Sequence, residues 1–193
     1  MLMDMEMDHL KPLFGNGLQD SHTGVQLAAL KAFSSTLIDS DRATRIQLSP
    51  LLQIAFEILP PLANNGDNDN LRSALLTFTQ LASSHPALFE SHVNSVLNFA
   101  GEVASQDERP FEVRQPALEL LLSLAEGISA SCRRHSKFSE TFIRLCLKWM
   151  SIRSSDVEDW ETTDVIDETI DEEEPAQVGE EYIDRLSNAL GMN

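Results

Sequence analysis

The sequence has few aromatic residues, few glycines and only two cysteines. Aromatic residues make up 6% of the 193-residue chain, and there are 8 glycines. Because β-sandwich strands are rich in aromatic and β-branched residues, this scarcity favours packed helices. An apolar content of 42% is enough for a hydrophobic core, so we expect a folded all-α protein. Two cysteines do not make a disulfide scaffold, so a reducing cytosolic or nuclear compartment is expected.

Positive charge is scarce as well. The chain has 14 Lys and Arg residues against 31 Asp and Glu residues, which gives a net charge of −17. Such a chain is repelled by phosphates, so we expect no nucleic-acid partner. The acidic N-terminal residues 1–8 are unlike a secretory signal, and no apolar run approaches the ~20 residues needed to span a bilayer. We therefore expect a soluble intracellular protein with no membrane insertion.

Motifs for catalysis, cofactors and metals are also missing. The sequence has no G-x-S-x-G motif, and the glycines of 15–17 lack the spacing of a phosphate-binding loop. Cys132, His135 and Cys146 are too few for a tetrahedral zinc site, and Cys146 lies in an apolar stretch typical of a core. We predict that the protein is not an enzyme and has no catalytic, cofactor-binding or metal site. The basic residues Arg133, Arg134 and Lys137 are interpreted as a solvated helix start.

An internal repeat organises the rest of the chain. Three helical segments align on an Ala-Leu pair, and their alanines, Ala29, Ala74 and Ala117, lie 45 and 43 positions apart. A period of ~40 to 47 residues with two helices is that of a HEAT-type α-solenoid. We predict about four helix pairs: first helices over 2–18, 46–63, 87–104 and 134–151, and second helices over 22–39, 69–83, 111–129 and 180–190.

Turn residues and prolines support this division. Clusters of Asp, Asn and Gly separate the predicted helices, as in 64–69, because these residues cap helix ends and turn the chain. Pro50, Pro86 and Pro116 lie at or near predicted helix starts, where a missing amide is tolerated. Pro60 and its neighbour Pro61 fall late in a predicted helix, where we expect a kink.

An acidic segment over 156–174 interrupts the fourth pair. From Ala117 to the matching position, Tyr182, is 65 residues, so about 20 residues are inserted. Residues 151–193 hold 14 acidic and 2 basic residues, and so carry −12 of the net charge. We therefore divide the chain into HEAT repeats (1–152), an acidic loop (153–179) and the last second helix (180–193). The loop is expected to be disordered unless a partner neutralises it.

The acidic loop is the candidate partner-binding site. Its carboxylates attract basic partners, and Trp160 offers a ring face to a Lys or Arg side chain. The alternative is a solvated linker that only improves solubility. The candidate residues are Asp156, Glu158, Asp159, Trp160, Glu161, Asp164, Asp167, Glu168, Asp171, Glu172, Glu173 and Glu174.

These features together resemble the karyopherin-β, or importin-β, superfamily of nuclear transport receptors, nearest the importin-beta-3 type. The residues that carry the resemblance are Val113–Glu126, Glu158–Glu161 and Gly179–Gly191. It implies non-covalent binding of basic import cargo and Ran-GTP, and also of nucleoporins. It further implies shuttling between cytoplasm and nucleus through the nuclear pore. The chain looks like about four central repeats of a longer solenoid.

Two other functions fit the same composition. A structural HEAT scaffold would bind its partners without any dependence on Ran-GTP. An acidic chaperone would bind basic proteins such as histones irrespective of Ran. In the receptor interpretation, the acidic loop makes the electrostatic contact and the second helices line the concave face.

Overall fold

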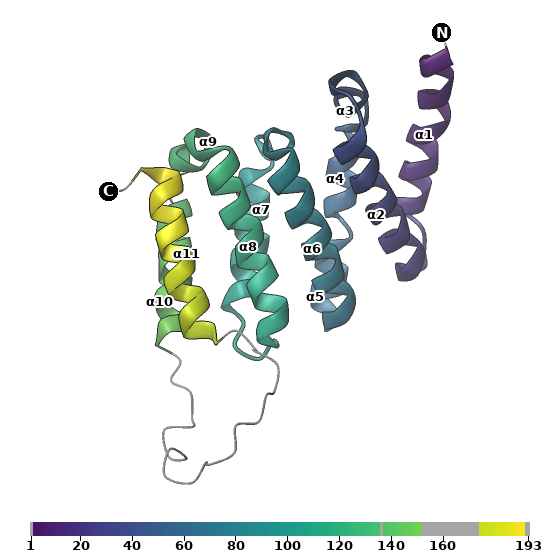
Figure 1. Ribbon diagram of the computed structural model, residues 1–193. Coiled ribbons are helices and arrows are strands. Elements are labelled where there is room, and N and C mark those ends of the chain that lie inside the picture. The colour runs from purple at the N-terminus through teal and green to yellow at the C-terminus, as the bar shows by residue number, and fades with distance from the viewer. Residues whose placement is uncertain (1, 136, 152–173, 192–193) are drawn as a thin grey trace, which may run out of the picture.

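The computed structural model describes residues 2–135, 137–151 and 174–191, and within these ranges the regular structure is helical. The helices stack along one axis in two layers (Figure 1). In chain order they are α1 (Leu2–Leu18), α2 (Thr23–Asp39), α3 (Arg42–Leu48), α4 (Leu51–Phe56), α5 (Leu59–Asn64), α6 (Asn68–Ser84), the 3-10 helix η1 (Pro86–Phe89), α7 (Val93–Ser105), α8 (Phe111–Gly127), α9 (Ser129–Arg134), α10 (Phe138–Met150) and α11 (Pro175–Leu190).

Consecutive pairs build the two layers. The first helices of the four pairs are α1, the run formed by α4 and α5, α7, and α10. The second helices are α2, α6, α8 and α11. Figure 1 shows α6, α8 and α11 side by side, with α7 and α10 behind them, and each second helix packs on the next. This arrangement confirms the predicted all-α solenoid of stacked helix pairs.

The turn between α5 and α6 shows why the polar clusters divide the repeats. Gly66 adopts a left-handed conformation with φ of 69°, which costs glycine little. Asp67 then caps α6, because its carboxylate accepts hydrogen bonds from the amide of Asn70 (3.4 Å) and from that residue's side-chain nitrogen (2.8 Å). Such a cap is typically worth about 1 kcal/mol of helix stability.

The prediction of one helix over 46–63 is wrong, because this part of the chain is not a continuous helix. The chain forms three helices there, and α3 is bent by 58° from the run that follows it at Pro50. A second break separates Phe56 from Leu59, just before Pro60, which has no amide to continue the hydrogen-bond pattern. The chain is thus interrupted near the prolines as expected, and Leu62 remains helical and buried.

Other helix starts also differ from the prediction. The helix expected from 87 is a 3-10 turn followed by α7 from Val93, and the helix expected from 134 begins at Phe138, after His135 adopts an extended conformation. The last helix begins at Pro175, inside the predicted acidic loop, because proline suits the first turn and Val178 is buried beneath it. The remainder of that loop, and its expected disorder, lies outside the described residues.

Aromatic side chains fill the space within and between pairs. Phe56 and Phe78, both of the second pair, stack at 4.7 Å between ring centroids, and Phe56 also meets Phe89 of η1 edge-on at 5.8 Å. Phe111 meets Trp149 edge-on at 4.9 Å between the third and fourth pairs. Each buried side chain of this kind contributes about 1.5 to 3 kcal/mol, so apolar burial dominates the stacking.

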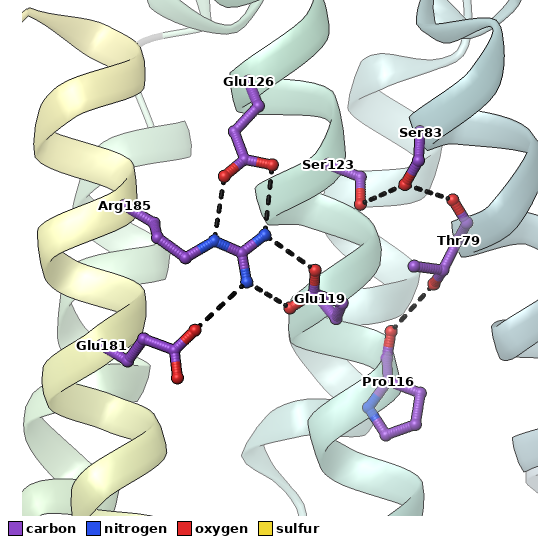
Figure 2. Close-up of polar contacts among 8 residues, drawn as sticks. All are labelled: Thr79, Ser83, Pro116, Glu119, Ser123, Glu126, Glu181 and Arg185. Atoms are coloured by element: carbon purple, nitrogen blue, oxygen red, sulfur yellow. Dashed lines mark hydrogen bonds and ion pairs between the residues drawn. The ribbon is translucent and has the colours of Figure 1, made fainter.

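Polar contacts that are not ion pairs supplement the seam between the second and third pairs. The Thr79 hydroxyl on α6 lies 3.4 Å from the Pro116 carbonyl on α8, and the hydroxyls of Ser83 and Ser123 are 3.1 Å apart (Figure 2). At the end of the same seam, Arg109 donates a hydrogen bond to the Ala63 carbonyl at 2.6 Å. None of these three contacts pairs opposite charges.

None of the described helices alone is long and apolar enough to cross a membrane. The bent run formed by Arg42–Leu48 and Leu51–Asn64 is long and apolar enough by length and composition only. Leu48, Leu52 and Leu59 in this run are buried in the protein core.

Gly127 at the end of α8 gives a direct test of the packing between pairs. A Cβ atom there would lie 2.3 Å from the ring of Pro86, whereas a Cβ on Gly24 would meet nothing within 4 Å. We expect Gly127→Ala to lower the free energy of unfolding by about 1 to 3 kcal/mol through overpacking. The matched Gly24→Ala should be neutral or slightly stabilising because it removes a helical glycine. Urea unfolding measures both, and equal effects would contradict this packing.

Candidate partner-binding surface

Of the twelve candidate partner-binding residues, only Glu174 lies in the part of the chain that the structure describes. It is exposed and extended, with φ of −66° and ψ of 135°, and it is the N-cap residue of α11. Its carboxylate lies at the positive end of the helix dipole, which favours an acidic side chain there. The other predicted residues, from Asp156 to Glu173, lie outside the described ranges.

The chain leaves the described structure at the end of α10, and this helix end is held by Lys148. Its ammonium nitrogen lies 2.8 Å from the Asp107 carboxylate and 3.0 Å from the Ser105 carbonyl of the preceding pair. The hydrogen bond from Lys148 lowers the pKa of Asp107. Asp107 also pairs with buried Arg114 at 3.3 Å, and that guanidinium lies over the ring of Trp149.

The chain re-enters through α11, and Arg185 holds this helix to α8 (Figure 2). Its guanidinium lies 2.9 and 3.2 Å from the two carboxylate oxygens of Glu119, and 2.9 and 3.1 Å from those of Glu126. Glu181 adds a third carboxylate at 3.6 Å. Hydrogen bonds to Glu126 and Glu119 raise the pKa of Arg185 above its ordinary value. Two bidentate pairs fix the guanidinium in both position and orientation.

A polar groove of about 350 Å³ lies on the second helices next to this ion-pair network. Exposed Leu76 and buried Tyr182 give it apolar surface. Among the described residues, neither Arg72 nor Glu112 at its edge forms an ion pair. The groove is lined by Arg72, Leu76, Glu112, Gln115, Pro116, Glu119, Glu181, Tyr182 and Arg185.

The composition of this groove suits a long cationic side chain. Leu76 and Tyr182 can pack against the methylene stem of a Lys or Arg side chain, while Glu112 and Glu181 face its charged head. Burial, together with the neighbouring Glu119 carboxylate, raises the pKa of Tyr182 above its ordinary value, so this phenol stays neutral. We call this groove, defined by its nine lining residues, the acidic groove.

A second hollow, of opposite character, lies between the first helices. It measures about 190 Å³ and is mostly apolar. It continues into a wider polar groove of about 580 Å³ that shares Pro60, Ser95 and Phe99. We call the first hollow the apolar cleft. Its lining residues are Gln53, Phe56, Glu57, Leu59, Pro60, Ser95, Val96, Phe99 and Leu120.

Neither surface was predicted from the sequence. Helical periodicity identifies buried positions, but it does not distinguish a side chain in a seam from one that lines an opening. The exposed Leu76, five residues after Leu71 in an amphipathic helix, is a weak signal of the acidic groove. The apolar cleft lies where α4 and α5 face α7, next to the break before Pro60, and the prolines predicted that interruption but not an opening beside it.

The two cysteines are buried in the core, and the basic cluster lies at and just after the end of α9. Cys132 and Cys146 are buried, and burial raises the pKa of their thiols to about 11 and about 12. In the described ranges, no three His, Cys, Asp or Glu residues are placed to hold a metal ion. Arg133, Arg134 and Lys137 are exposed, as expected of a solvated cluster, but the two arginines end α9 instead of starting a helix. Arg133 donates to the Leu190 carbonyl at 3.2 Å and Arg134 to the Ser131 hydroxyl at 2.7 Å.

Two protein-family models match the chain. One, described as "IPO5-like, TPR repeats", matches residues 2–99, which is just over half of the chain. The other, described as "Importin repeat", matches residues 108–193. The first match ends inside α7 and the second begins just before α8, so together they leave out only residue 1 and residues 100–107, and each helix pair is matched wholly or in large part.

Named relatives agree with these matches. Importin subunit beta-3 of Saccharomyces cerevisiae is 26% identical over 191 residues, which are 97% of this chain and 17% of that protein. A crystal structure of Kap121p bound to Nup53p superposes with a TM-score of 0.82 at 26% identity, covering 95% of this chain and 18% of that one. The karyopherin Kap121p bound to the SUMO protease Ulp1p gives a TM-score of 0.81 at 25% identity, covering 96% and 19%. The chain thus spans less than a fifth of the length of these relatives.

Tyr182 is the single tyrosine of the chain, so its ionisation can be measured without interference from others. Burial and Glu119 raise its pKa above 10.0, so the folded protein should show no tyrosinate absorbance near pH 10. The pKa of Tyr182 is higher in the folded protein than in the unfolded chain, so burying the neutral phenol contributes its full stabilisation below pH 10. This contribution to the free energy of unfolding decreases as the pH rises above 10, where the unfolded chain ionises. Ultraviolet difference spectra with circular dichroism test this, and the unfolded chain is the control. Ionisation near pH 10 with intact helices would contradict the burial.

Proposed function

The chain belongs to the importin-β, or karyopherin-β, family, and we propose that it is a segment of a nuclear import receptor that binds basic cargo and Ran-GTP non-covalently. The observation that carries this proposal is that Glu174, the last residue of the acidic segment, is the N-cap residue of the helix that carries Glu181 of the acidic groove. Glu174 and Glu181 are on the same helix, so the end of the segment is about 10 Å from the groove along α11. Both would present carboxylates to one partner.

The two acidic features would act at different ranges. The segment of 156–174 carries −11 of the net charge of −17, and this charge attracts a basic partner over about a Debye length, ~8 Å at physiological salt, and speeds its association. The groove holds Glu119 at a fixed position next to apolar surface, because Arg185 donates a hydrogen bond to each of its carboxylate oxygens. Long-range attraction sets the encounter rate, and fixed short-range contacts set the affinity and the choice of side chain.

Nucleoporin binding is a second proposed activity, and the apolar cleft supports it. Phe56, Val96 and Phe99 line a hollow on the first helices, in the layer opposite the acidic groove. A partner with exposed Phe side chains could insert a ring there while basic cargo occupied the other layer. Kap121p has been crystallised with Nup53p, which makes a nucleoporin a reasonable partner class for this chain.

The receptor role implies shuttling between cytoplasm and nucleus and requires no chemistry from the protein. A structural HEAT scaffold would bind partners equally well with or without Ran-GTP. An acidic chaperone would bind basic proteins regardless of Ran. The acidic groove favours the receptor over the chaperone, because a chaperone that relies on diffuse charge has no need of fixed carboxylates beside an apolar wall.

Neutralising the acidic segment tests the cargo proposal. Replacing the predicted acidic residues from Asp156 to Glu173 by Asn and Gln should weaken retention of a basic import cargo by about tenfold or more, because several charge pairs are lost. A pull-down at physiological salt, with and without Ran-GTP, measures this. A control neutralises three acidic residues outside the segment, Asp39, Asp41 and Asp69, which are exposed at helix ends, and is compared with a variant in which only three residues of the segment are neutralised. Equal retention of cargo by all variants would contradict the proposal.

The apolar cleft gives a separate prediction. Phe99→Ser removes the aromatic wall of the cleft, and binding of a Phe-Gly repeat peptide should weaken by about tenfold, the equivalent of ~1.4 kcal/mol. Leu147→Ser, at an exposed first-helix position outside the cleft, is the control. Fluorescence anisotropy measures the peptide, and circular dichroism checks that both variants remain folded. Unchanged binding by the folded Phe99→Ser variant would exclude the cleft.

A further inference from the structure

Arg185 and the acidic groove depend on the same carboxylates. Glu119 and Glu181 line the groove and also pair with Arg185, whereas Glu126 pairs with Arg185 from outside the lining set. The Arg185 guanidinium therefore lies where the charged head of a partner's Lys or Arg side chain would bind. Arg72 lines the same groove and is exposed, but among the described residues it forms no ion pair.

The pairing around Arg185 is strong enough to compete with an incoming cation. The guanidinium meets both oxygens of Glu119 and both of Glu126. Its side chain is 33% exposed and that of Glu119 only 25%, so water screens these contacts less than it screens a surface pair. Because Arg185 is part of the same chain, it is present at a high effective concentration.

We propose that Arg185 is an internal competitor of the acidic groove, so that a partner's cationic side chain gains Glu119 only in exchange for the ion pairs between α8 and α11. This inference rests on the proposed function, since it assumes that the groove accepts a basic partner. It adds that, without a partner, Arg185 already occupies part of the groove. Arg185 therefore lowers the affinity of the groove for a cationic side chain by competing with it for Glu119.

The shared carboxylates couple partner binding to the docking of α11. A cation that takes Glu119 weakens one of the two bidentate pairs that hold α11 on α8. By thermodynamic reciprocity, loosening these pairs must strengthen cation binding by the same factor. Partner binding in the groove is thus coupled to the docking of α11 on α8. A change in either one changes the other.

The experiment compares five full-length proteins: wild type, Arg185→Gln, Arg185→Lys, Arg72→Gln and Arg133→Gln. Arg72→Gln makes the same charge change in the same groove but frees no carboxylate. Arg133→Gln removes a different contact to α11, the hydrogen bond to the Leu190 carbonyl, and leaves the groove unchanged. Arg185→Lys keeps the charge, and its single ammonium group cannot hold Glu119 and Glu126 through two bidentate pairs.

The probe is fluorescein-labelled hexa-arginine, with binding measured by anisotropy at physiological salt and stability by thermal unfolding. We expect Arg185→Gln to bind about fivefold more tightly than wild type and to unfold at a lower temperature. Arg185→Lys should also bind more tightly, although its net charge is that of the wild type. Arg72→Gln should gain at most about twofold from its charge alone, and Arg133→Gln should not gain.

Three outcomes would overturn the inference. If Arg185→Gln binds no more tightly than Arg72→Gln, Arg185 is only a structural contact. If Arg133→Gln gains as much as Arg185→Gln, a loosened α11 rather than freed carboxylates explains the effect. If none of the five proteins binds hexa-arginine, the proposed function fails and this inference fails with it.

Discussion

Each helix pair in this protein buries part of its apolar surface within the pair and needs the pairs beside it to cover the rest. The repeat of 43 to 45 residues places a buried alanine, such as Ala74 or Ala117, at the same point of successive second helices, so that α6 and α8 can approach closely. Aromatic rings then fill the space between the layers, as Phe56 and Phe78 do. The positions of the groove, the cleft and the helix that follows the acidic segment all derive from this stacking.

The seams on either side of the third pair use different polar chemistry on top of the same apolar packing. Between the second and third pairs, neutral hydroxyls and carbonyls meet, as at Thr79 and Pro116. Between the third and fourth pairs, cations of the fourth pair meet carboxylates of the third, as Lys148 meets Asp107 and Arg185 meets Glu119. Neutral contacts respond little to salt, whereas ion pairs are screened by it, so the fourth pair is the unit whose docking is sensitive to ionic conditions.

Much of this arrangement could be predicted from the sequence, because the repeat period depends on regular apolar spacing. Ala74 and Ala117 located their helices correctly, and the Asp-Asn-Gly clusters located the turns. The break between Phe56 and Leu59 was misplaced because a missing amide acts on the preceding turn, which residue patterns do not localise. The groove could not be found, because Arg185 and Glu119 are 66 residues apart and meet only through the stacking of α8 and α11.

The separate anchoring of α10 and α11 has a consequence for how this protein can vary between species. Lys148 holds the first helix of the fourth pair and Arg185 holds the second, so neither contact relies on the residues between them. Doubling the length of such a connection costs only about 0.6 kcal/mol of closure entropy. Mutation can therefore lengthen, shorten or recharge this connection while the solenoid keeps its shape, which makes it a site where partner preference can diverge without a new fold.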